Sequence, residues 1–230
     1  MFGILYFYII NKMHNMKHLN QFITEYIIKK KLDKPIDSED HYEYTPKTKK
    51  ELINIIKTLL DKGETNLNCI NTSKITDMGR LFSDIRESGY NISNIEISMW
   101  NMSNVENFST MFFNCKDFNC DISEWDVSSM KRSSNMFWGC INFNCDLSKW
   151  NVSNLQVSDN MFFNCENLDC DLSNWNTKNL RRADQMFQGC RNMTCDISNW
   201  NVNGLYKYSV RDMFKYCKRK FIPDWYRKIK

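Results

Sequence analysis

The sequence predicts an α/β repeat solenoid, in which successive short turns of the chain stack on one another. The first observation is a period of 25 residues, marked by Trp100, Trp125, Trp150, Trp175 and Trp200. The second is a motif repeated between the tryptophans, which in one copy reads Met136-Phe137, Cys140, Phe143 and Cys145-Asp146. A fixed period of about 20 to 50 residues is typical of stacked repeats. Hydrophobic residues at 42% and aromatic residues at 14% are also sufficient to fill a core.

Residues 1–47 are predicted to be an apolar or helical segment followed by a polar linker. Residues 1–10 are almost entirely apolar, but they are too few to span a bilayer as a helix. They also lack the basic stretch that begins a signal peptide. One interpretation is that Met13 or Met16 is the true start, and the other is an uncleaved anchor that contacts a membrane. Residues 17–32 show helical spacing of apolar side chains.

A capping helix is predicted over residues 48–64, directly before the repeats. Thr48 and Glu51 form a capping-box pattern, and Gly63 is suited to end the helix. Its apolar residues recur at helical spacing and would cover the open end of the first turn. A repeat array requires such terminal caps.

The solenoid is predicted over residues 65–225, with a basic tail at 226–230. The first turn is five residues longer than the others, with the extra residues near Gly89, and the last copy reaches its Met213-Phe214 pair two residues late. The predicted turns are 71–100, 101–125, 126–150, 151–175, 176–200 and 201–225.

Within each turn we expect one short parallel strand and one short helix or 3-10 turn. Cys120 and Ile122 alternate with Asp121 and Ser123, which favours a strand whose copies pair in parallel between turns. Residues 134–140 would form one to two helical turns, since Met and Phe precede Cys at helical spacing.

The motif Met-Phe-x-x-Cys-x-x-Phe-Asn-Cys-Asp-Ile/Leu-Ser-x-Trp, which begins at Met111 and again at Met136, resembles the BspA-like leucine-rich-repeat surface proteins. The resemblance is to the 25-residue repeats of mycoplasma lipoproteins, also found in giant viruses, and covers residues 48–225. It implies a leucine-rich-repeat-like, right-handed stack of about six turns that serves adhesion or protein binding. It carries over no catalytic or cofactor residue.

Two departures from the family pattern bear on location. The commoner family residue at the Cys120 position is glutamine, and the chain opens with neither a lipobox cysteine nor a clear secretion signal. Asn, Lys and Ile are abundant. These features favour an intracellular setting, the host cytoplasm or the particle of a giant virus, over a secreted or cell-surface one.

Two cysteine ladders follow the repeat. One contains Cys115, Cys140, Cys165 and Cys190, and the other contains Cys120, Cys145, Cys170 and Cys195. Buried thiols are favoured because cysteine suits a tight apolar position. Disulfides between turns and thiolate metal sites remain alternatives.

A ladder of aspartates is a first candidate for partner binding: Asp121, Asp146, Asp171 and Asp196, with Glu96 in the preceding turn. Stacked carboxylates could gather calcium, but screening by water and by hydrogen bonds from neighbouring serines is favoured. The Asn or Asp after each tryptophan is expected to satisfy turn backbone groups and to bond to its copies.

An aromatic stripe is the second candidate, made of Phe113, Trp138 and Phe163 and interrupted at Gln188. These residues follow the Met-Phe pairs and would lie at or near the surface. Exposed aromatic side chains often mark partner sites. The alternative is that they pack beneath a returning loop.

Catalysis, cofactors and metals are not expected. The three histidines lie outside the repeats, and the chain has no phosphate-binding glycine loop. The net charge of +4 comes mainly from the two ends, while the repeats present carboxylates, so no nucleic-acid partner is expected.

The predicted function is a non-enzymatic scaffold that binds a protein through its repeat surface. The alternative is a structural component, for example of a virus particle, that self-associates. A monomer would support the first and a large oligomer the second.

Overall fold

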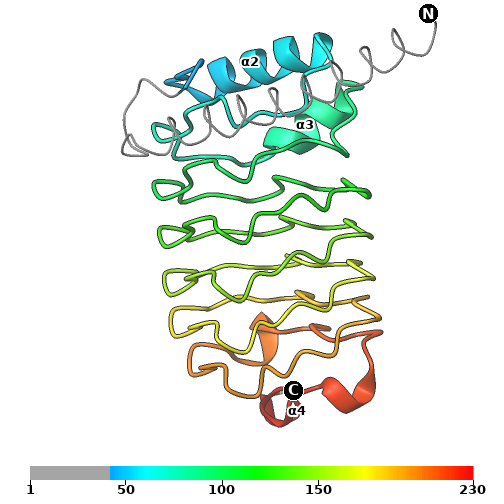
Figure 1. Cartoon of the computed structure of the whole chain (residues 1–230). Coiled ribbons are helices and arrows are strands. Elements are labelled where there is room, and N and C mark those ends of the chain that lie inside the picture. The colour runs from blue at the N-terminus through cyan, green and yellow to red at the C-terminus, as the bar shows by residue number, and fades with distance from the viewer. Residues whose placement is uncertain (1–41, 230) are drawn as a thin grey trace, which may run out of the picture. The chain divides into compact units, whose positions relative to one another are not determined.

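The computed structural model describes residues 42–229 of the chain. Residues 43–230 form one compact unit, in which turns of chain are stacked in sequence order between helices at its two ends (Figure 1). The predictions for the apolar start, the helix at 17–32 and the linker as far as residue 41 lie outside the described residues. No helix of the described part has the length and apolar character needed to cross a membrane.

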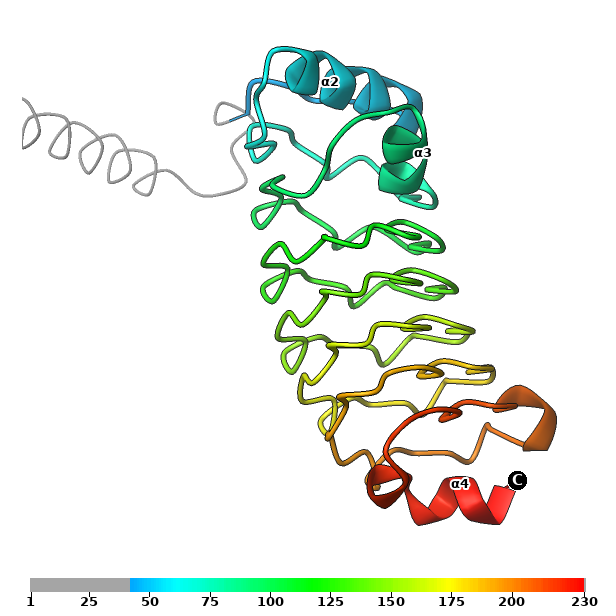
Figure 2. The same cartoon turned by 90° about the vertical axis from the view of Figure 1, so that its right-hand side faces the viewer.

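Helix α2 (Lys49–Asp61) covers the N-terminal end of the stack (Figures 1 and 2). The Thr48 side chain accepts a hydrogen bond from the Glu51 amide at 3.2 Å. At the other end, Gly63 has φ +78°, and the amides of Gly63 and Glu64 bond to the carbonyls of Leu60 and Leu59. This is a Schellman motif. The predicted helix, its cap and its stop are therefore confirmed.

Residues 43–47, predicted as linker, are instead part of the folded unit. Tyr44 forms a parallel bridge with Ile70, and the Glu43 amide donates to the Cys69 carbonyl at 2.9 Å. Pro46 is buried. The prediction was wrong here because a polar composition does not prevent backbone pairing with the first turn.

The turns are joined mainly along one part of each repeat, here called the Met-Phe segment (residues 107–114 and their equivalents). Alternate amides donate to the next turn at 2.6 to 2.9 Å: Phe108 to Arg132, Thr110 to Ser134, Phe112 to Met136 and Asn114 to Trp138. The set recurs one repeat later, with Ser133, Asn135, Phe137 and Gly139 as donors. Parallel bridges at Asn107, Arg132, Val157 and Arg182 mark the same register.

The alternating donors depend on residues with left-handed backbone. Asn135 has φ +57° and Gly139 has φ +70°, and the equivalent positions repeat this in the neighbouring turns. Asn and Gly tolerate this conformation best. The predicted helix at 134–140 is therefore wrong, since two left-handed residues interrupt it. A helix occupies this position in the longer first turn, as α3 (Leu81–Glu87).

The predicted strand at Cys120–Ser123 is also wrong. Asp121 Oδ1 accepts a hydrogen bond from the Ser123 amide at 3.0 Å, so these residues form a side-chain turn. Among the described residues the leucine-rich-repeat-like α/β strands are absent, and the backbone is mostly irregular apart from isolated bridges. The alternation of Asp and Ser reflects this turn rather than a period-two strand. The right-handed sense of the stack stays a prediction.

The core is a continuous aromatic cluster inside the stack. Each repeat adds a buried phenylalanine whose ring lies 5.2 to 5.6 Å from the next. The column is Phe82, Phe112, Phe137, Phe162, Phe187 and Phe214. The tryptophan side chains form hydrogen bonds between neighbouring turns. The Trp150 indole N–H, for example, donates to the Ile122 carbonyl of the preceding turn at 3.0 Å.

The C-terminal end is closed by the 3-10 helices η2 (Lys207–Ser209) and η3 (Arg219–Phe221) and by helix α4 (Asp224–Ile229). Tyr226 is 5% exposed, and its ring packs 5.0 Å from that of Phe214. The Trp225 indole N–H donates to the Ile197 carbonyl at 3.1 Å. Residues 226–229, predicted as tail, are thus part of a cap, because Tyr226 supplies an apolar cover that the basic residues around it obscured.

Candidate interaction surface

The aromatic stripe of Phe113, Trp138 and Phe163 forms a continuous, partly exposed column across three turns. The Phe113 and Trp138 rings are 5.1 Å apart edge to face, and those of Trp138 and Phe163 are 4.6 Å apart. The preceding Met and Phe of each turn are fully buried, at 0% exposure for Met136 and Phe137. The predicted stripe therefore lies at the surface, and its rings contact one another.

The stripe ends in both directions at polar residues. Ser83 precedes it in the first turn, where its hydroxyl donates to the Arg80 carbonyl at 3.0 Å. Gln188 follows it, is 8% exposed, and accepts a hydrogen bond from Gln185 Nε2 at 2.8 Å. The exposed aromatic column is thus confined to three turns, as the sequence indicated.

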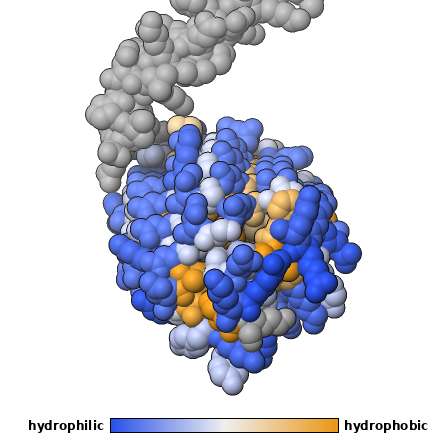
Figure 3. Space-filling view, turned by 90° about the horizontal axis from the view of Figure 1, so that it is seen from below, coloured by the Kyte–Doolittle hydropathy of each residue, from blue (hydrophilic) through white to orange (hydrophobic). Residues whose placement is uncertain are grey.

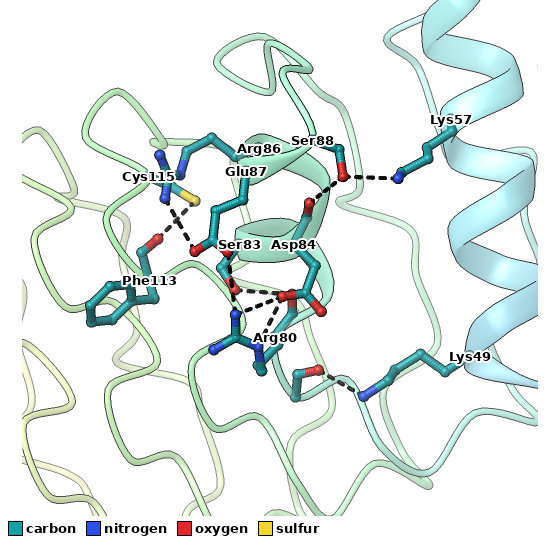
Figure 4. Close-up of polar contacts among 11 residues, drawn as sticks. Lys49, Lys57, Arg80, Ser83, Asp84, Arg86, Glu87, Ser88, Phe113 and Cys115 are labelled. Carbon is teal, nitrogen blue, oxygen red and sulfur yellow. Dashed lines mark hydrogen bonds and ion pairs between the residues drawn. The ribbon is translucent and has the colours of Figure 1, made fainter.

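Charged side chains of α3 border the Phe113 end of the stripe (Figure 4). Arg80 pairs with Asp84 at 2.9 Å and with Glu87 at 3.4 Å, and Arg86 lies 3.7 Å from Glu87. The Cys115 thiol donates to the Phe113 carbonyl at 3.7 Å. Burial raises the pKa of Cys115 to about 12, although Arg86 opposes the shift. Cys115 is thus protonated and structural.

Two buried amide oxygens without a hydrogen-bond partner lie in the turns that carry the stripe, Asn135 Oδ1 and Asn160 Oδ1. Each residue's carbonyl accepts the backbone N–H of a stripe residue, Trp138 at 3.3 Å and Phe163 at 3.1 Å. In the following turn Gln185 fills the equivalent position and bonds to Gln188. Of Asn135, Asn160 and Gln185, the one with a side-chain hydrogen bond is therefore Gln185, in the turn where Gln188 replaces the aromatic residue.

The aspartate side chains of the ladder are exposed, and each already accepts a hydrogen bond from a nearby backbone amide. The side chains of Asp121, Asp146, Asp171 and Asp196 each accept the amide of the serine two residues on, at 2.9 to 3.0 Å. These bonds lower the pKa of all four carboxyls.

An open hollow of about 480 Å³ is lined in part by Glu96, Cys120 and Asp121. Within residues 42–229 no three Cys, His, Asp or Glu side chains are grouped as metal ligands.

No cysteine in the described residues forms a disulfide bond. In the ladder that begins at Cys115, the three later thiols donate to a carbonyl of the preceding turn, as Cys140 does to Phe112 at 3.0 Å and Cys165 to Phe137 at 2.9 Å. Burial raises their pKa well above the ordinary value. In the other ladder Cys145 accepts the Ile122 amide at 3.3 Å, and burial raises its pKa to about 11. These thiols are therefore poor nucleophiles at neutral pH.

An asparagine ladder between turns lies at a position that the sequence interpretation missed. Asn142 Nδ2 donates to Asp117 Oδ1 at 3.0 Å, Asn167 to Asn142 at 3.3 Å, and Asn192 to Asn167 at 3.1 Å. Asparagine at one position in three consecutive repeats was the available signal. The Asn or Asp after each tryptophan satisfies a turn amide as predicted, as Asn151 Oδ1 does for Ser153. Among the described residues these side chains do not bond to their copies, so that part of the prediction was wrong.

Comparison with known proteins places the repeats in one family. No curated protein and no solved structure matches the chain. One family model matches twice in tandem, over residues 51–169 and 121–225. Because these matches cover most of the chain, it belongs to the repeat family described as "Mycoplasma protein of unknown function, DUF285".

Proposed function

We propose that this protein is a non-enzymatic binding module whose partner protein docks on the aromatic stripe. The observation that carries the proposal is the column of Phe113, Trp138 and Phe163, partly exposed and in ring-to-ring contact across three turns. Aromatic side chains held at a surface dominate the energetics of many protein interfaces. Ring contacts also fix their positions, so little conformational entropy is lost on binding.

The partner matched to this surface is an apolar or aromatic segment lying along the stack. The stripe is closed at one end by the α3 charges around Arg80 and Glu87 and at the other by the Gln185–Gln188 pair. A hydrophobic centre with a polar rim is typical of specific interfaces. The finer resemblance to BspA-like leucine-rich-repeat proteins agrees with such a role, and an intracellular or virus-particle setting remains part of the proposal.

The caps favour a monomer over end-to-end assembly. Leu52 and Ile56 of α2 are fully buried at one end, and Phe214 at the other is 4% exposed beneath Tyr226. The buried core is therefore covered at both ends of the stack. The alternative function, a self-associating structural component, would therefore have to use the side of the stack.

The test is affinity capture from the natural host with the whole chain and with a Trp138→Ala/Phe163→Ala variant. Both residues are partly exposed, so the variant should keep its tryptophan near-ultraviolet circular dichroism apart from the lost indole. We expect a partner retained by the wild type to be lost from the variant, with at least a ~10-fold drop in affinity once it is purified.

The matched control is Met99→Ala, which removes a side chain that is 66% exposed on another part of the surface. It should retain the partner. Equal binding by the wild type and the stripe variant would exclude the stripe. Elution as a large oligomer on size exclusion with light scattering would favour the structural alternative.

A further inference from the structure

The last turn and its cap differ from the rest of the stack in charge. Residues 204–229 contain eight Lys or Arg and two Asp, a net charge of +6. Residues 65–203 contain 11 basic and 16 acidic residues, a net charge of −5. The basic charge of the C-terminal part is thus concentrated in one folded turn rather than spread over the array.

All eight of these basic side chains are exposed. Three lie in salt bridges: Arg211 with Asp184 at 2.8 Å, Lys215 with Asp212 at 3.6 Å and Arg227 with Asp224 at 3.2 Å. The structure gives no salt bridge, among the residues it describes, to the other five, which are Lys207, Lys218, Arg219, Lys220 and Lys228. Much of the positive charge is therefore available to an external anion.

Exposed tyrosines accompany these cations. Four large hydrophobic side chains in the described part are strongly exposed, and three belong to this turn: Tyr206 at 63%, Tyr208 at 84% and Tyr216 at 65%. Lys215 Nζ lies 5.5 Å from the centre of the Tyr216 ring. Exposing three aromatic rings to water is unfavourable, so their presence on one turn favours a ligand that covers them.

Hydrogen bonds fix the backbone of the segment that carries the three tyrosines. The Ser209 hydroxyl accepts the Tyr206 amide at 2.9 Å and donates to the Tyr206 carbonyl at 2.8 Å, which closes η2 around Tyr208. The Met213 carbonyl accepts the Phe187 amide at 3.0 Å, and the Cys217 thiol donates to the Phe187 carbonyl at 2.9 Å. These bonds hold the segment on the preceding turn. Figure 3 views this end of the stack and shows small apolar areas among strongly hydrophilic side chains.

We propose that this basic, tyrosine-bearing surface (residues 206–228) binds single-stranded nucleic acid without sequence preference. The lysines contact phosphates, and the tyrosine rings stack on bases. Single-strand binding sites combine these two features, a cationic surface and exposed aromatic faces. An acidic peptide would engage the cations, but it offers no flat rings to match three exposed tyrosines.

This inference departs from the sequence-based expectation, which gave residues 226–230 as a basic tail and expected no nucleic-acid partner. In the chain Tyr206 and Tyr208 flank Lys207, and Tyr216 follows Lys215, so exposed rings lie next to exposed cations in the last turn. The acidic repeats take no part in the proposed site, which is independent of the aromatic stripe and of its protein partner.

The first measurement is fluorescence anisotropy of a labelled oligothymidylate of about 20 nucleotides with the whole chain. We expect saturable binding that weakens on the order of 100-fold between about 50 and 200 mM salt, as release of counterions from several phosphates requires. Absence of saturable binding at the lower salt concentration would overturn the proposal.

Charge variants then locate the site. Lys207→Gln/Lys218→Gln/Lys220→Gln should reduce the slope of log affinity against log salt by about 2. The matched control is Lys47→Gln/Lys50→Gln/Lys62→Gln, which removes the same charge from three exposed lysines around α2. Equal losses in the two variants would show a general charge effect and contradict the assigned site.

Stacking of bases on the tyrosine rings distinguishes nucleic acid from other polyanions as the ligand of this surface. Tyr208→Ala should weaken oligothymidylate binding by at least ~5-fold and leave an abasic strand of the same length unaffected. Equal binding of polyglutamate and oligothymidylate, with no effect of Tyr208→Ala on either, would assign the surface to acidic protein segments and overturn the proposal.

Discussion

Two parts of each repeat hold the stack together in different ways. In the Met-Phe segment, alternate backbone amides donate directly to the next turn, as Phe137 does to Met161 at 2.9 Å. In the Asp-Ser segment (residues 117–124 and their equivalents) only one backbone bond per turn crosses, such as Asn142 to Lys116. Side chains make the other links there, including the Asn144 amide to Asn119 Oδ1 at 2.9 Å. A repeat protein can thus join its turns by backbone on one side and by side-chain ladders on another.

This difference predicts which sequence changes the Met-Phe segment and the Asp-Ser segment each tolerate. A backbone-bonded segment depends on φ angles, and therefore on Asn and Gly at its left-handed positions. A side-chain-bonded segment depends on the identity of Asn, Asp and Ser at fixed positions. Changes in the Met-Phe segment should accordingly cost more stability than changes in the Asp-Ser segment.

The largest effect is expected inside the Met-Phe segment, at Phe137→Ala. The Phe137 ring is fully buried and stacks between Phe112 and Phe162 at 5.6 Å on each side. Its loss should lower the free energy of unfolding by about 3 to 5 kcal/mol, measured by urea denaturation. Trp138→Ala, at the adjacent but partly exposed position, should cost less than half as much. Equal costs would contradict the assignment of inside and outside.

A smaller effect is expected from Gly189→Ala. Gly189 has φ +80°, and a Cβ there would collide with the Asn164 side chain of the preceding turn. We expect a loss of about 1 to 3 kcal/mol from the backbone strain and the collision. The Asn164→Gly/Gly189→Ala double variant should regain the collision part of the loss. If it regains nothing, the alternation of Asn and Gly at this position has another cause.

In the Asp-Ser segment, Asn142→Ala removes two exposed side-chain bonds, to Asp117 and from Asn167. The expected loss in the free energy of unfolding is about 1 kcal/mol, which is ordinary for such hydrogen bonds. Asn174→Ala is the control, because Asn174 is exposed and makes no side-chain hydrogen bond among the described residues. It should change stability by less than about 0.5 kcal/mol. Indistinguishable variants would mean that the asparagine ladder adds no stability.

The smallest effect is expected at Asp146, and it depends on pH. The Ser148 amide lowers the pKa of this carboxyl below its unfolded value, so its contribution is present above about pH 4 and is lost as pH falls through the lowered folded pKa. Asp146→Ala should cost about 0.5 kcal/mol at pH 7 and less at pH 3. Asp146→Asn keeps the acceptor and should remove most of this pH dependence. Urea midpoints at the two pH values provide the measurement.

Much of the architecture could be predicted from particular residues. The Trp and Met-Phe periods predicted the stack, the Thr48 and Gly63 signals predicted α2, and the break at Gln188 predicted the end of the stripe. Each of these is a local pattern with one structural meaning.

The secondary structure inside the turn could not be predicted in the same way. An Asp-x-Ser pattern fits both a strand with alternating faces and a side-chain turn, and Asp121 forms the turn. Asn135 and Gly139 stand four residues apart, which is compatible with a helix unless their left-handed φ angles are recognised. The Asn or Gly in every repeat was the signal for these angles, and the helical interpretation of residues 134–140 did not use it. The C-terminal cap was missed because residues 226–230 were interpreted as a tail, whereas Asp224–Ile229 fold as α4.

Native-state amide hydrogen exchange tests the central claim, that backbone bonds of the Met-Phe segments join the turns. The amides of Phe137, Gly139, Phe162 and Asn164 donate to the next turn, so they should exchange only through unfolding of the stack. The amides of Asn144 and Ser148 donate to side chains and should exchange much faster. Strong protection of residues 144–148 together with rapid exchange in 135–139 would contradict the account.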